Sequence, residues 1–291
     1  MNKSKIIAHF GANFYEKLLL DLHKYTELWR LSDFEQVDYY SINCIFTCVS
    51  ERHGPCVLKL GEPSDETAHE YGVLREYEGT RFCRVYEADV PNGVLLLERI
   101  VPGTRLRDVP ELDRRIELFR EVYGSFHKAP ADSSLYPTYM ECVSKEAKEM
   151  QERGGFEALT AHMREAERLC RSLCGRYTGE VLLHGDLHHD NILLGNDGRY
   201  RIIDPKGVVG DGVFDIPRFI LNELDGVTDD DFRGKYLHVT QGLSAGLGVP
   251  EADIRQLTYV EMCLCESWTS ENGQPREEQV QFARRMMDEI L

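Results

Sequence analysis

The chain has little basic charge and no long apolar run, and both shortages restrict the kinds of protein it could be. Its 291 residues contain 34 lysines and arginines against 50 aspartates and glutamates, a formal net charge of −16. Nucleic acids and anionic membranes bind basic faces, so neither is expected as a partner. No stretch approaches the roughly 18–20 consecutive apolar residues of a membrane-spanning helix, and residues 1–5 lack the apolar core of a secretory signal. We therefore expect a cytoplasmic protein.

The nine cysteines do not form a pattern that binds zinc or builds a disulfide framework. Their number is odd, and no export signal is recognisable. None of the closely spaced pairs is joined by histidines at the spacing of a zinc site. We therefore expect reduced thiols that serve as small apolar packing residues.

The stretch from residue 183 to residue 206 is the most informative part of the sequence. It places Asp186 and Asn191 between two apolar runs, and Asp204 directly after a third. Phosphoryl transfer requires an acid that receives the proton of the acceptor hydroxyl, and oxygen ligands that hold Mg²⁺ against the nucleotide phosphates. Asp186 fits the first task, and Asn191 with Asp204 fits the second.

The pattern around these residues predicts a β-hairpin. Two short apolar strands, 192–194 and 200–203, are joined by Gly-Asn-Asp-Gly, whose residues tolerate the positive φ angles of a tight connection. The hairpin brings Asn191 and Asp204 to the same end, and Asp186 lies in the loop before it. Acids in loops are usually solvated turn formers, but the second acid at the end of the return strand favours a functional site.

At these residues the chain resembles the aminoglycoside phosphotransferase family, the small-molecule branch of the protein-kinase-like fold. Residues 184–193, His-Gly-Asp-Leu-His-x-x-Asn-Ile-Leu, are similar to that family's catalytic loop. Ile203-Asp204-Pro205 stands where protein kinases have their metal-binding Asp-Phe-Gly. The continuation Asp204-Pro205-Lys206-Gly207 is similar to the subgroup of the streptomycin 6-phosphotransferases and hydroxyurea phosphotransferases.

The resemblance implies an α+β, protein-kinase-like bilobal fold. Residues 1–101 would form a small N-terminal nucleotide-binding lobe with a β-sheet and a helix. Residues 102–291 would form a larger, mainly helical lobe that carries the catalytic loop and binds the acceptor. Within that second lobe, apolar residues at helical spacing predict amphipathic helices over 114–128 and 145–176.

A lysine inside an apolar strand is the candidate for holding the nucleotide phosphates. Lys59 lies in the run 56–60, and burying a lysine is costly without anionic partners. A helix expected from Ser64 onward, with a capping residue followed by acids, offers Glu66 and Glu70 on one face. The resemblance favours Glu70, which falls where the family's helix carries the pairing acid. A strand-end lysine that reaches water is the alternative.

The remaining nucleotide contacts are assigned by position. Residues 40–49 contain no glycine, so the turn that covers the phosphates would use Ser41, Asn43 and backbone N–H groups. The resemblance implies that the segment from Glu98 to Ile100, at the end of an apolar strand, faces the adenine. Backbone groups would read the base there, so the sequence does not distinguish ATP from GTP.

Several residues near the loop are expected to support it. By resemblance, Asp215 opens a helix under the catalytic loop and fixes the loop backbone with hydrogen bonds. His184 is expected to be a scaffold residue that hydrogen-bonds the loop. His188 would touch the acceptor or steady Asp186, and His189 would be exposed.

Acidic residues late in the chain would suit a cationic acceptor. They comprise the segment 223–231 together with Glu261 and Glu266. An aminoglycoside carries several cationic groups, so an acidic rim beside Asp186 would attract it and help to orient a hydroxyl. Charge runs are usually solvated faces, however, and the sequence leaves open whether this segment contacts the acceptor.

Residues and resemblance together predict an enzyme, a small-molecule kinase that uses Mg²⁺ and ATP or GTP. It would move the γ-phosphoryl group to a hydroxyl of a small molecule, and the leading prediction for this acceptor is an aminoglycoside-type antibiotic. One alternative is a metabolic kinase acting on a sugar, choline or a homoserine-like alcohol. Another is a nucleotide-binding protein without turnover. The sequence determines neither the acceptor, nor the hydroxyl that is modified, nor the oligomeric state.

Overall fold

The chain is divided into two compact units in the computed structural model, which describes residues 1–37, 43–227, 229–270 and 285. Unit 1 comprises Met1–Thr104 and Leu193–Pro205, and unit 2 comprises Arg105–Ile192 and Lys206–Leu291. The segment 193–205 belongs to unit 1 because Ile202 exchanges backbone hydrogen bonds with Arg81 and Cys83. The expected lobes, 1–101 and 102–291, stay a prediction.

Unit 1 is built on a five-stranded sheet with the strand order β1-β2-β3-β5-β4, in which every neighbouring pair is antiparallel. The strands are β1 (Leu31–Gln36), β2 (Asn43–Ser50), β3 (Gly54–Gly61), β4 (Val85–Asp89) and β5 (Val94–Glu98). A short 3₁₀ turn, η1 (Val90–Asn92), joins the last two. Strand β3 lies at the centre and carries Lys59.

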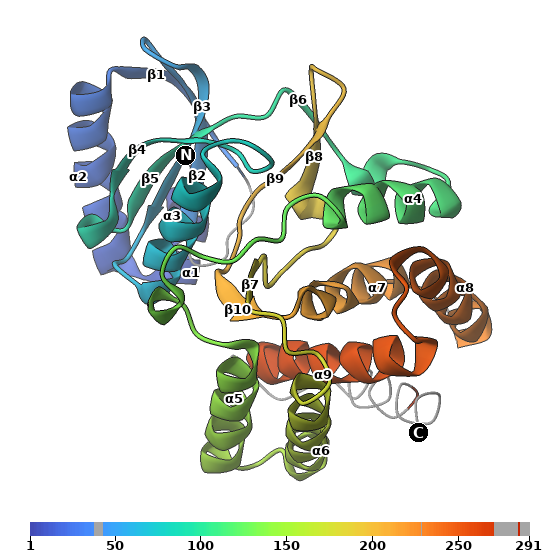
Figure 1. Cartoon of the computed structure of the whole chain (residues 1–291). Coiled ribbons are helices and arrows are strands. Elements are labelled where there is room, and N and C mark those ends of the chain that lie inside the picture. The colour runs from blue at the N-terminus through green and yellow to red at the C-terminus, as the bar shows by residue number, and fades with distance from the viewer. Residues whose placement is uncertain (38–42, 228, 271–284, 286–291) are drawn as a thin grey trace. The chain divides into compact units, whose positions relative to one another are not determined.

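Helices cover both faces of this sheet (Figure 1). They are α1 (Lys3–Phe10), α2 (Ala12–Trp29) and α3 (Asp65–Tyr77). Leu58 and Leu60 of β3 pack into one core with Leu18 and Tyr25 of α2. Because successive side chains of a strand point to opposite faces, Lys59 points the other way, toward the face covered by α3.

The predicted hairpin is confirmed. Strand β8 (Ile192–Gly195) is followed by β9 (Tyr200–Ile202), and both belong to a three-stranded sheet of order β6-β8-β9 with β6 (Pro102–Arg105). Apart from Arg105 and Ile192 at its ends, this sheet lies in unit 1. Gly198 in the turn has a φ of +74°, a value that glycine adopts without strain.

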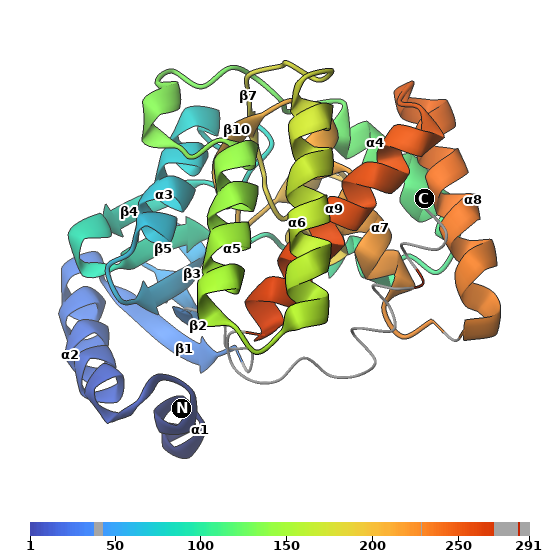
Figure 2. The same ribbon diagram turned by 90° about the horizontal axis from the view of Figure 1, so that it is seen from below.

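Unit 2 is mainly helical. Its helices are α4 (Leu112–Tyr123), α5 (Tyr139–Arg153), α6 (Glu157–Cys174), α7 (Pro217–Leu224), α8 (Asp229–Leu247) and α9 (Glu251–Ser270). Its 3₁₀ turns are η2 (Leu106–Asp108), η3 (Ser133–Leu135), η4 (His189–Asn191) and η5 (Gly212–Asp215). Strands β7 (Val181–Leu183) and β10 (Val208–Gly210) form a small antiparallel pair. In Figure 2, α5 and α6 lie side by side and α9 crosses them.

The expected helix over 145–176 is wrong as a single element. It is two helices, because Gly154 and Gly155 adopt φ angles of +65° and +80°, which end α5 and turn the chain before α6 begins. The helix expected over 114–128 is present as α4, but it ends at Tyr123 and Gly124 caps it.

Three general features of the chain follow from the same structure. A sheet-based unit and a mainly helical unit give the α+β class that the sequence predicts. Within the part of the chain that the structure describes, no helix is both long and apolar enough to cross a membrane. All nine cysteines lie in described residues, and each is a free thiol.

Candidate active site

Lys59 in unit 1 is held between two carboxylates. Its ammonium group donates to Glu70 Oε1 at 2.7 Å and also pairs with Asp204 Oδ1. The Lys59 and Glu70 side chains are only 8% and 7% exposed. Burial lowers the pKa of a lysine, but the charges of Asp204 and Glu70 outweigh it and raise the pKa of Lys59. Lys59 is therefore charged at neutral pH.

The local structure of α3 explains why Glu70 is the partner. Ser64 caps the helix by accepting a hydrogen bond from the Thr67 N–H, so the helix begins where the sequence predicts. Glu70 then falls on the buried face, whereas Glu66 lies in the exposed first turn. Of the two acids considered, the buried one contacts Lys59.

Asp204 follows β9 with a φ of +62°, in the left-handed region that residues other than glycine seldom occupy. Aspartate tolerates this conformation better than most residues, and such strain is concentrated at functional sites. The Asp204 side chain is 40% exposed and is anchored by Lys59. The carboxylate is thus fixed without being fully covered.

The loop between β7 and η4 in unit 2 contains Asp186 and is pinned by Asp215. The two Asp215 carboxylate oxygens accept the backbone N–H groups of His184 and Gly185, each at 2.8 Å. His127 Nε2 lies 2.9 Å from the same carboxylate, which is almost completely buried. The expectation that Asp215 fixes the loop backbone is confirmed.

Inside the loop, polar side chains form hydrogen bonds with the loop's own backbone. His184 Nδ1 accepts the Asp186 N–H at 3.0 Å, as expected of a scaffold residue. Asn191 Nδ2 donates to the Asp186 carbonyl at 3.0 Å, which fixes the plane of the Asn191 amide. His188 Nε2 lies 3.7 Å from Asp186 Oδ1, and burial lowers the pKa of His188 to about 4, so its ring is neutral. The predicted base therefore sits in a turn that is held by hydrogen bonds from His184 and Asn191.

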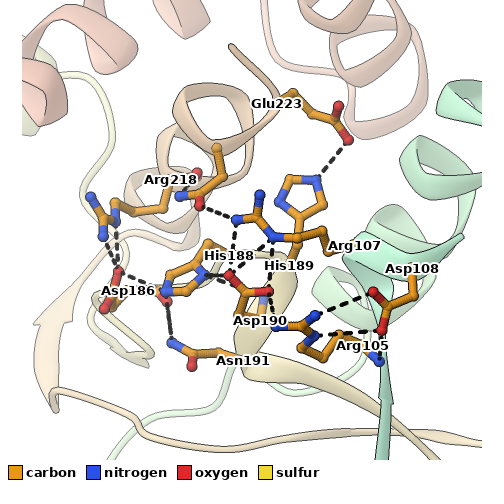
Figure 3. Close-up of polar contacts among 11 residues, drawn as sticks. Arg105, Arg107, Asp108, Asp186, His188, His189, Asp190, Asn191, Arg218 and Glu223 are labelled. Carbon is orange, nitrogen blue, oxygen red and sulfur yellow. Dashed lines mark hydrogen bonds and ion pairs between the residues drawn. The ribbon is translucent and has the colours of Figure 1, made fainter. Parts of the chain in front are cut away.

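Asp186 is paired with an arginine that the sequence did not single out. Arg218, in the first turn of α7, approaches Asp186 Oδ1 with Nε at 2.6 Å and Nη2 at 2.5 Å (Figure 3). Its Nε also lies 3.8 Å from Glu261 Oε1. An arginine early in a helix is usually solvated, so its residue type carried no signal. Its position three residues after Asp215 was the available clue.

A second arginine fixes the far side of the loop. Arg107 binds Asp190 with both Nε and Nη2 at 2.9 Å (Figure 3). Its Nη2 also donates to Asn222. Next to this pair, His189 Nε2 lies 2.7 Å from the buried Glu223. The expected exposure of His189 is wrong: the residue is 2% exposed, because it lies in η4 with its ring stacked on Phe219 of α7.

Two of the acids expected in the acidic rim are buried. Glu223 and Glu261 are 4% and 2% exposed, so they are internal charges and cannot form a surface rim. Glu223 is instead paired with Arg115 at 2.6 Å, and Asp225 is exposed. Residue 228 and the side chains of 229 and 230 lie outside the described residues. Burial raises the pKa of Glu266 to about 7.

The predicted nucleotide contacts have mixed surroundings. Asn43 is buried at the start of β2, opposite Gly61. The Glu98 N–H donates to the Arg84 carbonyl at 2.8 Å, and Ile100 is 9% exposed. Ser41 lies outside the described residues. The roles of these residues stay predictions.

The predicted metal ligands suit a hard cation. Asn191 in unit 2 and Asp204 in unit 1 offer an amide oxygen and a carboxylate, the donor types that Mg²⁺ prefers. Among the described residues, no group of three or more His, Cys, Asp and Glu side chains could hold a metal ion. Mg²⁺ commonly takes only one or two protein carboxylates and completes its shell with phosphate and water. Each residue by itself offers a donor of the right type, and their joint role as metal ligands stays a prediction.

A lysine between two acids on a sheet unit, and a His-x-Asp-x₄-Asn loop on a helical unit, define a protein of the kinase-like class. Residues 32–273 match the model of a family described as aminoglycoside/hydroxyurea antibiotic resistance kinase. The chain belongs to this family, and the subgroup inferred from the sequence is confirmed.

Two similar curated proteins are named for the hydroxyurea and streptomycin activities of this family. The chain is 28% identical over 220 residues to the hydroxyurea phosphotransferase of Kitasatospora aureofaciens, a match that covers 73% of this chain and 63% of the relative. It is 25% identical over 172 residues to the streptomycin 6-kinase of Streptomyces griseus, with 55% and 52% covered. The chain thus spans less than two thirds of the length of these two relatives.

Solved structures share the fold. A choline kinase from Streptococcus pneumoniae has a TM-score of 0.69 at 15% identity and covers 94% of this chain and 99% of its own. The aminoglycoside phosphotransferase APH(4)-Ia, as a thermostable mutant with ADP and hygromycin B, has a TM-score of 0.63 at 14% identity, with 92% and 96% covered. These likenesses confirm the protein-kinase-like fold.

Proposed function

We propose that the protein transfers the γ-phosphoryl group of ATP to a hydroxyl of a small-molecule antibiotic. The observation that carries this proposal is the position of Lys59 between Glu70 and Asp204. A buried lysine that is paired with two acids is costly as a purely structural element, but it is suited to binding phosphate. Family membership supports the same reaction.

In this proposal, unit 1 binds the donor. Lys59, oriented by Glu70, holds the α- and β-phosphates. Ser41 and Asn43 would cover the phosphates, and the segment from Glu98 to Ile100 would read the base. ATP is the preferred donor and GTP the alternative, because backbone groups at that segment could accept either base.

Unit 2 activates the acceptor. Asp186 orients the hydroxyl and takes its proton as the new oxygen–phosphorus bond forms and the bond from the γ-phosphorus to ADP breaks. Asn191 and Asp204 would hold Mg²⁺, which when bound neutralises phosphate charge. Correct placement of the reacting groups contributes most of the remaining rate enhancement.

The names of the relatives suggest two kinds of acceptor. Hydroxyurea is a small uncharged molecule, whereas an aminoglycoside such as streptomycin is cationic and would suit the net charge of −16. An antibiotic acceptor remains our first choice, with a metabolic alcohol such as choline as the alternative. Cytoplasmic location and the lack of nucleic-acid and membrane partners stay predictions.

A panel of acceptors tests the proposal. The full chain, with ATP and Mg²⁺, is incubated with hydroxyurea, streptomycin, hygromycin B or choline, and both ADP release and product mass are measured. We expect acceptor-dependent ADP release and a product heavier by one phosphoryl group for at least one antibiotic. Phosphorylation of choline alone would replace the antibiotic function with the metabolic one. Expression in a sensitive host should then confer resistance to the accepted antibiotic.

A further inference from the structure

Four side chains from four elements of unit 2 form a continuous polar chain that ends at Asp186. Tyr139, the first residue of α5, donates its hydroxyl to Glu261 Oε2 at 2.7 Å. The other oxygen of Glu261 faces Arg218 at 3.8 Å, and Arg218 contacts Asp186 at 2.5 and 2.6 Å. Nothing in the sequence predicted this connection between the interior of the helical unit and the loop.

The packing around Arg218 leaves it little freedom. Pro217 opens α7, and Phe219 and Ile220, the next two residues, are completely buried, which fixes the helical turn that carries the arginine. Nη1 donates to the sulfur of Cys265 on α9, next to Glu261. The guanidinium is therefore held from behind while its Nε and Nη2 point toward the loop.

The contacts of Asp186 are uneven. Both arginine nitrogens, and His188 at 3.7 Å, lie near Oδ1. Among the described residues no hydrogen bond or ion pair involves Asp186 Oδ2. Two donors on one oxygen fix the rotation of the carboxylate, so the direction in which Oδ2 points is determined as well.

We propose that Arg218 is a positioning residue that holds Asp186 through Oδ1 and presents Oδ2 to the acceptor hydroxyl. Glu261 and Tyr139 keep the guanidinium in place, and Glu261 competes weakly for it because its oxygen is more than 1 Å farther away than that of Asp186. This inference rests on the proposed role of Asp186 as the base. It adds a residue whose loss should impair the chemical step and leave donor binding unchanged.

The pairing also has a consequence for the acceptor. A lone carboxylate would attract any cationic group nearby, but the charge of Asp186 is balanced by Arg218. The acceptor hydroxyl is thus selected by its position relative to Oδ2, and a cationic acceptor gains little attraction from Asp186 itself. Cationic groups of an aminoglycoside would have to be bound elsewhere.

Kinetics of Arg218 variants test the proposal. With the best acceptor of the panel, Arg218→Gln should lower kcat by about 100-fold, the order expected when a catalytic group is misplaced by about 1 Å, while KM for ATP stays within about twofold. Arg218→Lys keeps the charge but not the two-donor geometry, so its kcat should lie between those of the wild type and Arg218→Gln. The control Arg171→Gln removes an exposed ion pair with Glu167 on α6 and should match the wild type.

Chemical rescue separates positioning from folding. In Arg218→Ala, a few millimolar methylguanidinium should restore kcat at least tenfold without changing the thermal unfolding midpoint. A kcat for Arg218→Gln within twofold of the wild type would overturn the proposal, and so would a loss of activity that methylguanidinium does not relieve. If Arg218→Gln does not fold, Arg218→Lys and the rescued alanine variant decide the matter.

Failure of the proposed function would look different. If the wild type phosphorylates nothing in the panel, crystal structures of wild type and Arg218→Gln still test the positioning role. A rotated or disordered Asp186 carboxylate in the variant supports it. The same Asp186 orientation in both structures overturns it, whatever the reaction is.

Discussion

Arg218 contacts a single oxygen of Asp186, Oδ1, with Nε at 2.6 Å and Nη2 at 2.5 Å. The predicted base is therefore an acid whose orientation is set by a neighbouring helix, in addition to the loop that carries it. Asp215 fixes the backbone of that loop. Arg218 fixes the side chain (Figure 3). Backbone and side chain thus have separate supports, which can be removed one at a time.

Glu70→Gln should weaken donor binding. The amide keeps the size of the side chain but removes one of the two charges that hold the Lys59 ammonium. We expect KM for ATP to rise by about tenfold, about 1.4 kcal/mol of binding free energy. Initial rates over a range of ATP concentrations measure it. Glu66→Gln, in the exposed first turn of the same helix, is the matched control and should not change KM; equal effects of the two would contradict the assignment.

Asp215→Asn should loosen the loop. An amide has one oxygen, so either the His184 or the Gly185 N–H would face an NH₂ group and lose its acceptor. Leaving one buried N–H unpaired costs about 1–3 kcal/mol, which urea unfolding would detect, and kcat should fall together with stability. Asp197→Asn in the exposed hairpin turn provides the comparison. Unchanged stability of Asp215→Asn would show that these two bonds do not hold the loop.

Glu261 should make stability depend on pH. Burial raises the pKa of Glu261 to about 7, against the opposing effects of Arg218 and Tyr139, whereas an unfolded glutamate titrates near 4.5. Between these values the folded state binds the extra proton, so the contribution of Glu261 to stability is greatest at low pH and decreases as pH rises from about 4.5 to 7. About one pH unit above 7, its contribution becomes constant.

The measurement is the stability difference between wild type and Glu261→Gln. This difference should shift against the wild type by on the order of 2.5 kcal/mol between pH 5 and pH 8, with most of the change below pH 7.5. Other titrating groups, such as His188 and Glu266, are common to both proteins and largely cancel. A pH-independent difference would mean that Glu261 does not titrate in this range.

The features that the sequence predicts are those whose chemistry is local. Lys59 in an apolar strand required an acidic partner, and the capped helix that follows offered Glu66 and Glu70. The family resemblance favoured Glu70, which is the observed partner. The hairpin followed from its turn residues, whereas the role of Asp215 was implied by the family resemblance and is confirmed by its two hydrogen bonds to the loop backbone. In each case a short segment contains most of the information.

What the sequence missed depends on how the helices of unit 2 pack. His189, Glu223 and Glu261 look like solvated residues in a linear sequence, and the packing of the helices of unit 2 makes them internal. The contact between Arg218 and Asp186 likewise depends on how the helices pack and could not be predicted from the sequence. The break at Gly154 and Gly155 is different, because two adjacent glycines signalled it and helical periodicity on both sides concealed it.

A single-turnover experiment tests the central claim most directly. It compares wild type and Asp186→Asn in the transfer of the labelled γ-phosphoryl group of ATP to the best acceptor of the panel. The variant keeps the size of the side chain and an oxygen for Arg218, but it loses the proton acceptor. We predict that labelled product forms at least about 100-fold more slowly than with the wild type. Product formation by Asp186→Asn at the wild-type rate would contradict the account.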